Sequence, residues 1–175
     1  LSGEIGFKEY LEKVDGFCKD GVDSGYEGEF KDEVECIEAA KAIYAICLNE
    51  SLSKHGQDIG TEQVIIENLA NILIYCYVAD STLSRVMQHK DFYESKNQIV
   101  PELCAKVYTA EQGIRVMEYA YKILNNIYSG DIPSDLNAKL DVLKERLSLT
   151  TDTIGLKKII GEKVVESGGY PVQSF

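Results

Sequence analysis

Proline is scarce in this sequence: only Pro101, Pro133 and Pro171 occur among 175 residues. Because proline interrupts helices, its scarcity leaves long stretches free to be helical. Hydrophobic residues make up 45% of the chain and charged residues 27%, which is typical of a soluble globular protein. At this length we expect one domain that buries about two-thirds of its unfolded surface.

Basic charge is also in short supply. The formal net charge is −11 and the sequence pI is about 4.7. A nucleic-acid binder needs a basic stripe for phosphate contacts, and none is visible, so we expect no nucleic-acid partner. An acidic surface also argues against contact with an anionic membrane. We interpret the acidity mainly as a solubility feature.

Cysteine pairs of the kind that bind metals are missing. The five cysteines are odd in number and no Cys-x-x-Cys occurs, which argues against a disulfide framework or a zinc knuckle. Four of them lie in apolar helical patterns, where free cysteine behaves as a small core residue: Cys36, Cys47, Cys76 and Cys104. Together with Cys18 they indicate a reducing compartment. We therefore expect a cytoplasmic location, and a position at the periphery of a membrane stays open.

Histidine is limited to His55 and His89. A di-iron site in a helical bundle needs Glu-x-x-His on two helices, but Leu52 and Val86 stand three residues before these histidines. Both histidines lie at predicted helix ends rather than at an exposed mid-helix position, which argues against phosphotransfer chemistry. No local pairing of cysteine with histidine indicates a nucleophile and its base.

Nucleotide and cation motifs are absent as well. No Gly-x-Gly-x-x-Gly or Walker-type loop occurs, and we interpret the glycines at 25 and 28 as a flexible connector. An acidic cluster lacks the spacing of an EF-hand loop and is better explained as a charge bias at a helix N-terminus: Glu27, Glu29, Asp32, Glu33, Glu35 and Glu38. We therefore assign no catalytic, cofactor-binding or metal-binding residue.

Helical periodicity dominates what remains. Apolar residues at spacings of three and four predict long helices over 29–55, from a Thr61 N-cap to about Lys90, and over 97–128. Gly56 is the expected stop of the first, and Pro101 is tolerated in the first turn of the third. The second is apolar nearly all round, so we expect it to be the most buried element. At about 26–32 residues, each would be roughly 40–48 Å long.

Shorter elements flank these three helices. A short helix near the N-terminus leads into a loop marked by Gly16, Gly21, Gly25 and Gly28, so residues 1–28 form a helix and linker and residues 29–175 the bundle. Further helices are predicted over 134–147 and 154–166, and either could supply a fourth wall. Residues 170–175 should be extended. The predicted fold is all-α: an up-down antiparallel bundle of about four main helices.

The start of the sequence and its longest apolar run indicate whether the chain carries a signal peptide or a membrane span. No signal peptide appears, and the run over 64–79 is broken by Glu67, Asn68 and Asn71, so we expect it to be too short and too polar to span a bilayer. The sequence starts at Leu1 rather than at methionine, so we expect a piece of a longer protein or a processed one.

The sequence contains eleven tyrosines, which are its main indication of a possible interface. Tyrosine serves core edges and protein interfaces alike, so both readings stay open. In the third long helix we expect an exposed apolar patch outside the main stripe, formed by Tyr108, Val116, Tyr119 and Ile123. Such a patch would favour a two-fold dimer over a monomer. We place Leu73 at the centre of the core, where replacement by alanine would cost about 2–5 kcal/mol.

One family resemblance rests on residues 30–86 and on the end of the chain. Lys54-His55-x-x-x-Ile59-x-x-Glu62-Gln63 stands between two long helices, followed by Leu69-Ala70 and by the run from Ala79 to Arg85. With the ending from Val165 to Phe175, these residues resemble the C-terminal helical domain of very-long-chain acyl-CoA dehydrogenases.

The resemblance implies a non-catalytic role. In that family FAD, the acyl-CoA thioester and the catalytic glutamate belong to a preceding core, so no cofactor is expected in this chain. The appendage is associated there with subunit packing and inner-membrane association, which makes the chain's own catalytic core a partner. The alternative is a freestanding helical interaction module with no enzymatic parent.

Overall fold

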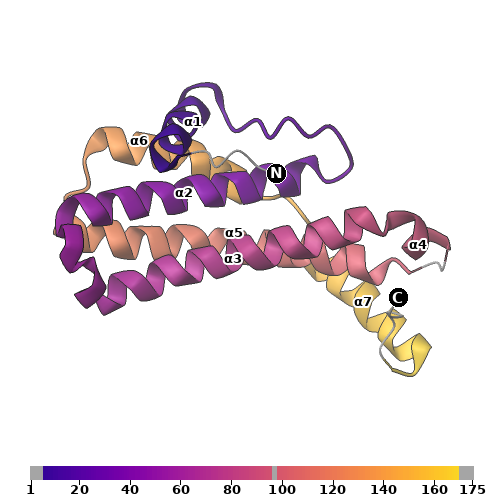
Figure 1. Ribbon diagram of the computed structural model, residues 1–175. Coiled ribbons are helices and arrows are strands. Elements are labelled where there is room, and N and C mark those ends of the chain that lie inside the picture. Colours follow the sequence, from indigo (N-terminus) through magenta and orange to yellow (C-terminus); the bar gives the residue numbers. More distant parts are fainter. Residues whose placement is uncertain (1–5, 96–97, 170–175) are drawn as a thin grey trace.

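The structure, a computed structural model, describes residues 6–95 and 98–169 and is entirely helical over that part of the chain (Figure 1). The order is α1 (Phe7–Asp20), α2 (Lys31–His55), η1 (Gly56–Thr61), α3 (Gln63–Gln88), α4 (Lys90–Ser95), α5 (Val100–Ile127), α6 (Ser134–Leu147) and α7 (Thr153–Ser167). The all-α prediction is confirmed. The extended tail predicted over 170–175 lies outside the described residues.

Three long helices, α2, α3 and α5, run up, down and up beside one another and share most of the tertiary contacts (Figure 1). Their lengths are 25, 26 and 28 residues. α6 returns along α2, and α1 lies across α2 and α6. α7 packs only against α5 among the stronger helix pairs and projects beyond the bundle. The fourth wall is therefore α6, on the α2 side.

The turn between α2 and α3 shows why the first helix ends where it does. Gly56 follows α2 with a φ of +54°, a conformation that glycine adopts without steric cost, and its N–H bonds the carbonyl of Leu52. The chain then forms the 3₁₀ turn η1. Thr61 is not the N-cap of α3: its hydroxyl donates to the carbonyl of Asp58, and Glu62 precedes the helix instead.

Two other boundaries differ from the prediction. The second long helix stops at Gln88, and after His89 a separate short helix, α4, begins. At the N-terminus, α1 continues through Gly16, which was predicted to open a loop. Burial of Val14 and Phe17 on either side of Gly16 outweighs the helix cost of glycine, about 1 kcal/mol.

Burial is distributed differently from the prediction. α2 buries 12 of its 25 residues and α5 buries 13 of 28, whereas α3 buries only 9 of 26. Small residues explain the difference, because they let neighbouring helices approach α2 and α5 on several sides: Ala39, Ala40, Ala42 and Ala45 in α2, and Ala105, Ala110, Gly113 and Ala120 in α5. The prediction that α3 is the most buried helix is wrong.

Individual core assignments change accordingly. Leu73 is 50% exposed, so its placement at the centre of the core is wrong. Val116 and Ile123 are buried, so they form no exposed patch on α5, and Tyr108 and Tyr119 are half-buried against the core. Among the cysteines, Cys36, Cys47 and Cys76 are buried as predicted, but Cys104 is exposed.

α3 also bears on the expectation about membranes. The whole helix, Gln63–Gln88, is long and apolar enough by length and composition to cross a bilayer, contrary to the expectation drawn from its shorter apolar run. Core helices of soluble proteins meet the same test, so the finding is weak evidence. Here one side of α3 packs against α2 and α5.

Candidate interaction surface

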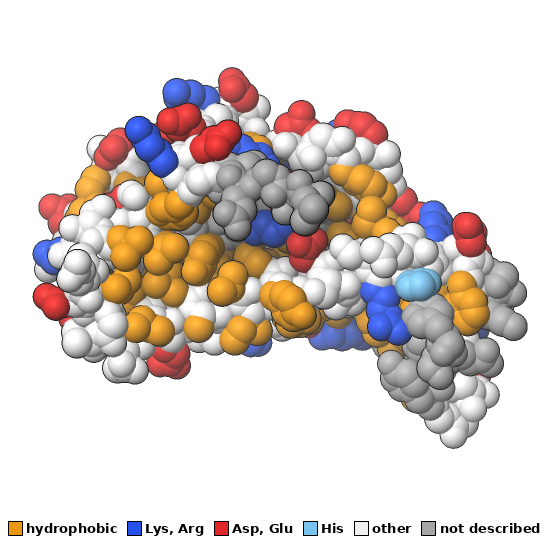
Figure 2. Space-filling view, in the orientation of Figure 1, with side chains coloured by type: hydrophobic (Ala, Val, Ile, Leu, Met, Phe, Trp, Pro, Cys, Tyr) orange, Lys and Arg blue, Asp and Glu red, His pale blue; other side chains and the backbone are white. Residues whose placement is uncertain are grey.

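The surface that stands out is the outward side of α3. Its large apolar side chains are exposed: Ile66 by 38%, Leu73 by 50%, Ile74 by 57% and Tyr77 by 72%. With the exposed Ala70 they form what we call the α3 apolar face. Figure 2 shows hydrophobic side chains gathered over α2 and α3, with charged groups mainly around the margin. Soluble monomers seldom expose contiguous apolar patches of this kind unless they serve an interaction.

Helical geometry explains why these residues share one side. Residues 66, 70, 73 and 77 recur at steps of four, three and four, which places them in one row along the helix. The buried row of α3 includes Ile65, Ile72 and Cys76 and faces α2 and α5. Because both rows are apolar, the sequence of α3 appears hydrophobic all round although only one side is covered.

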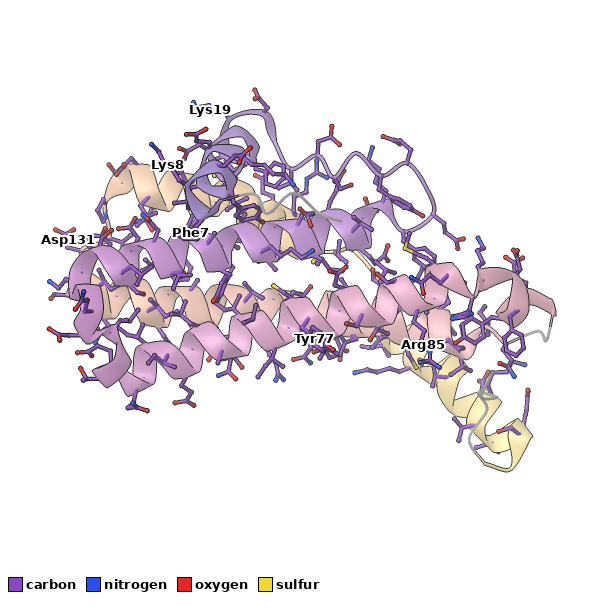
Figure 3. The ribbon with its side chains drawn as sticks, viewed as in Figure 1. Phe7, Lys8, Lys19, Tyr77, Arg85 and Asp131 are labelled. Carbon is purple, nitrogen blue, oxygen red and sulfur yellow. The ribbon has the colours of Figure 1, made fainter. Side chains whose placement is uncertain are left out.

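A hollow of about 270 Å³ adjoins this face where α1, α2 and α3 meet. Its walls are mostly apolar side chains from all three helices: Phe7 and Tyr10 of α1, Tyr44, Ala45 and Leu48 of α2, and Leu73 and Cys76 of α3. Figure 3 labels Phe7 at the start of α1 and Tyr77 midway along α3. The hollow and the projecting α3 side chains together give a surface with both a groove and a ridge.

Among the described residues that line the hollow, Lys41 is the one charged side chain, and its ammonium is neutralised locally. Its Nζ lies 3.0 Å from Glu38 and 3.1 Å from Asp80. Burial opposes its charge, but these carboxylates outweigh burial and raise the pKa of Lys41. Burial likewise opposes ionisation of Glu38, yet Lys41 and Lys13 hold its pKa below the usual range. The cluster therefore joins α1, α2 and α3 as an ion-pair network.

Tyr10 contributes a polar atom beside the hollow that has no partner. Its hydroxyl is buried and makes no hydrogen bond with the described residues. Burial, with the nearby Glu38 and Cys76, raises the pKa of Tyr10 well above its ordinary value. The phenol is thus neutral, and its half-buried ring forms a mostly apolar wall of the hollow.

The acidic cluster at the start of α2 consists of structural ion pairs rather than a cation site. Glu35 is buried and meets Arg146 of α6 at 2.9 Å, and Glu29 meets Lys90 at 2.6 Å and Lys106 at 3.5 Å. The first contact connects α2 with α6, and the other two connect the segment just before α2 with α4 and α5. Among the residues that the structure describes, no group of three or more potential ligands is placed to hold a metal ion.

The two histidines lie at helix ends, as predicted. His55 closes α2, and its Nδ1 lies 3.6 Å from a carboxylate oxygen of Glu62 across the η1 turn. His89 follows α3, with its ring edge-on to Tyr93. Neither occupies the exposed mid-helix position that phosphotransfer would require.

The buried thiols are not poised as nucleophiles. Cys36 Sγ lies 3.4 Å from the hydroxyl of Tyr75, which also donates to the carbonyl of Thr109 at 3.3 Å. Burial raises the pKa of Cys36 to about 11 and that of Cys76 to about 12. Because the thiolate is the reactive form, these groups are inert at neutral pH.

The geometry therefore defines a class: an all-helical bundle with an uncovered apolar face and no assembled catalytic group in the described part. The family model for the acyl-CoA dehydrogenase C-terminal domain matches residues 39–144, a range that spans most of α2 and α6 and everything between them. The chain belongs to this family. No curated protein and no solved structure matched it.

Full-length acyl-CoA dehydrogenases use FAD, but the residues described here do not fit that cofactor. Three hollows measure about 250, 270 and 150 Å³, whereas pockets for such ligands span about 300–1,000 Å³. Lys41 and Lys90, which line two of them, already pair with carboxylates rather than offering charge to a pyrophosphate. These three hollows, in the part of the chain that the structure describes, thus offer no site for the cofactor.

The sequence did not predict the exposed apolar face of α3, for a specific reason. We expected an exposed patch on the third long helix, but the structure places it on α3, which was assigned to the core. The sequence did contain a signal for this: α2 and α5 are rich in alanine, and small residues mark helices that neighbours can approach closely. The bulkier apolar residues of α3 do not mark it in this way. In this bundle α2 and α5 take the central, most buried positions, and α3 packs on them with one side only.

Proposed function

We propose that this chain is the non-catalytic, C-terminal helical unit of an acyl-CoA dehydrogenase and that it packs subunits through the α3 apolar face. The family match over residues 39–144 carries this proposal. The exposed apolar row on α3 supports the packing role, because a surface of that kind gains free energy when a partner removes it from water.

Two finer points belong to the same proposal. The residues around the α2–α3 turn, from Lys54 to Gln63, favour the very-long-chain type of enzyme. Five free cysteines, one of them exposed, support a reducing compartment, since exposed thiols persist there.

The experiment compares the longer product of the same reading frame with a version that lacks residues 29–175. We expect an upstream catalytic core that keeps its turnover per bound flavin after the truncation, while its assembled mass in solution changes by more than the removed residues account for. A stop codon just upstream of Leu1 would contradict the proposal and favour the freestanding interaction module. Lost turnover with unchanged assembly would also contradict it.

A further inference from the structure

We propose that the partner of the α3 apolar face is the same face of a second copy of this chain, related by a two-fold axis. The inference rests on the packing role proposed above and names its partner. A two-fold interface uses one patch on both subunits, so that patch must be self-complementary.

Charge is the first argument for a second copy. Each chain carries −11, so two copies repel one another over most of their surfaces. Between Gln63 and Tyr77 the only residue charged at neutral pH is Glu67, which lies at the edge of the face, in line with Ile74. Lys41 neutralises Asp80 at the far end of the row. The α3 apolar face is thus the region where two acidic copies can approach with little repulsion.

Shape is the second argument. The face combines a ridge, where Tyr77 is 72% exposed, with the adjacent hollow of about 270 Å³ lined by Tyr44, Leu48 and Leu73. A ridge and a hollow side by side on one patch allow each copy to fill the hollow of the other. Tyrosine suits this role, since it buries a large apolar body while keeping its hydroxyl at the wet edge.

The spacing of the row sets a register. In an antiparallel pair of α3 helices whose axis passes between Ala70 and Leu73, Ile66 lies opposite Tyr77 of the second copy and Ala70 opposite Leu73. Each large residue then meets a smaller one, and Gln63 lies opposite Asp80, whose carboxylate can accept from its amide. Small residues opposite large ones permit close helix packing.

The primary test measures the mass of the 175-residue chain by sedimentation equilibrium over a range of concentrations. We expect a monomer of 19.5 kDa to convert to twice that mass, with tighter association at higher salt because salt screens the like charges. Tyr77→Lys should weaken dimerisation at least about tenfold by placing an unpaired charge in the interface. This variant lowers the net negative charge, so added repulsion cannot explain the loss.

Val165→Lys on α7 is the matched control. Val165 is 81% exposed on a helix that projects away from α3, so introducing a lysine there should leave dimerisation unaffected. Urea unfolding of each variant confirms that it is folded. An equal loss in both variants would overturn the assignment to α3.

A charge-pair variant tests the register. Ile66→Glu or Tyr77→Lys alone should weaken the dimer, and the two together should restore part of the affinity, because residue 66 faces residue 77 only across the axis. Within one chain these positions are about 16 Å apart along the helix. Absence of any recovery would overturn the register.

Other occupants give different results. A chain that stays at 19.5 kDa at every concentration contradicts the second-copy proposal. If the same chain still changes the assembly of its catalytic core, the proposed function survives and α3 docks on that core. If it instead binds vesicles of anionic lipid, the surface is a membrane contact and the dimer proposal fails.

Discussion

Gly113 of α5 lies where neighbouring helices leave little room for a side chain. A Cβ at this position would lie 3.1 Å from Cys36 Sγ, 3.2 Å from the Tyr75 hydroxyl and 3.4 Å from the Leu147 carbonyl oxygen. α5 thus approaches α2, α3 and the end of α6 at one point. The missing side chain explains how the Cys36–Tyr75 contact can form beside the helix.

We expect Gly113→Ala to destabilise the protein by about 1 kcal/mol. Alanine gains about 1 kcal/mol in helix propensity, but overpacking costs about 1–3 kcal/mol where a carbonyl and a buried hydroxyl must move. Gly16→Ala in α1 is the control: nothing lies within 4 Å of its Cβ position, so it should stabilise by about 0.5–1 kcal/mol. Urea unfolding measures both, and an equal gain at the two sites would disprove the close contact.

Glu38 gives the molecule a defined acid sensitivity. The pKa of Glu38 is lowered in the folded state because Lys41 and Lys13 outweigh its burial. A carboxyl with a lowered folded-state pKa stabilises the fold above its unfolded pKa, and that contribution is lost as pH falls through the folded value. We expect Glu38→Gln to be less stable than wild type at pH 7 and nearly equal to it at about pH 3.

The control is Glu12→Gln, a change at an exposed position of α1. It should shift the unfolding midpoint little at either pH. If wild type and Glu38→Gln lost stability in parallel as the pH fell, the ion pairs with Lys41 and Lys13 would contribute nothing.

At the scale of the helices, α3 has one packed side and one uncovered side. Alanine substitution at two leucines, one buried and one on the uncovered side, tests this difference. Leu140 of α6 is fully buried, whereas Leu73 of α3 is 50% exposed. We expect Leu140→Ala to cost about 2–5 kcal/mol through lost transfer free energy and a cavity. Leu73→Ala should cost less than about 1.5 kcal/mol in the monomer. Chemical unfolding at low protein concentration makes the comparison, and similar losses would show that Leu73 is packed.

Most helices could be predicted from apolar spacing. Gly56 and Pro101 correctly marked a helix stop and a helix start, because glycine tolerates positive φ and proline needs no N–H in the first turn. The N-cap prediction for Thr61 was wrong because its hydroxyl instead donates to the carbonyl of Asp58 within the η1 turn. Boundaries set by such local competition cannot be read from residue type alone.

The covered side of a helix was harder to predict. Spacing identifies an apolar row, but α3 has apolar residues on all sides, so its pattern did not say which row faces α2 and α5. That choice depends on the small residues of the neighbouring helices and on the outer side of α3 being left uncovered by the helices that the structure describes. Both are properties of the assembled bundle.

At the scale of the whole molecule, the family match over residues 39–144 identifies an acyl-CoA dehydrogenase C-terminal domain, and the residues that the structure describes do not fit a flavin. The bundle offers packed helices, structural ion pairs and one large uncovered apolar face. The proposed role in subunit packing rests on that face.

Flavin content tests this account most directly. The visible absorbance of bound flavin is measured on the purified 175-residue chain and on the longer product of its reading frame, after both are mixed with excess FAD and freed of unbound cofactor. We predict no bound flavin in the chain and one flavin per subunit in the longer protein. Stoichiometric FAD on the 175-residue chain alone would contradict the claim that this domain is non-catalytic.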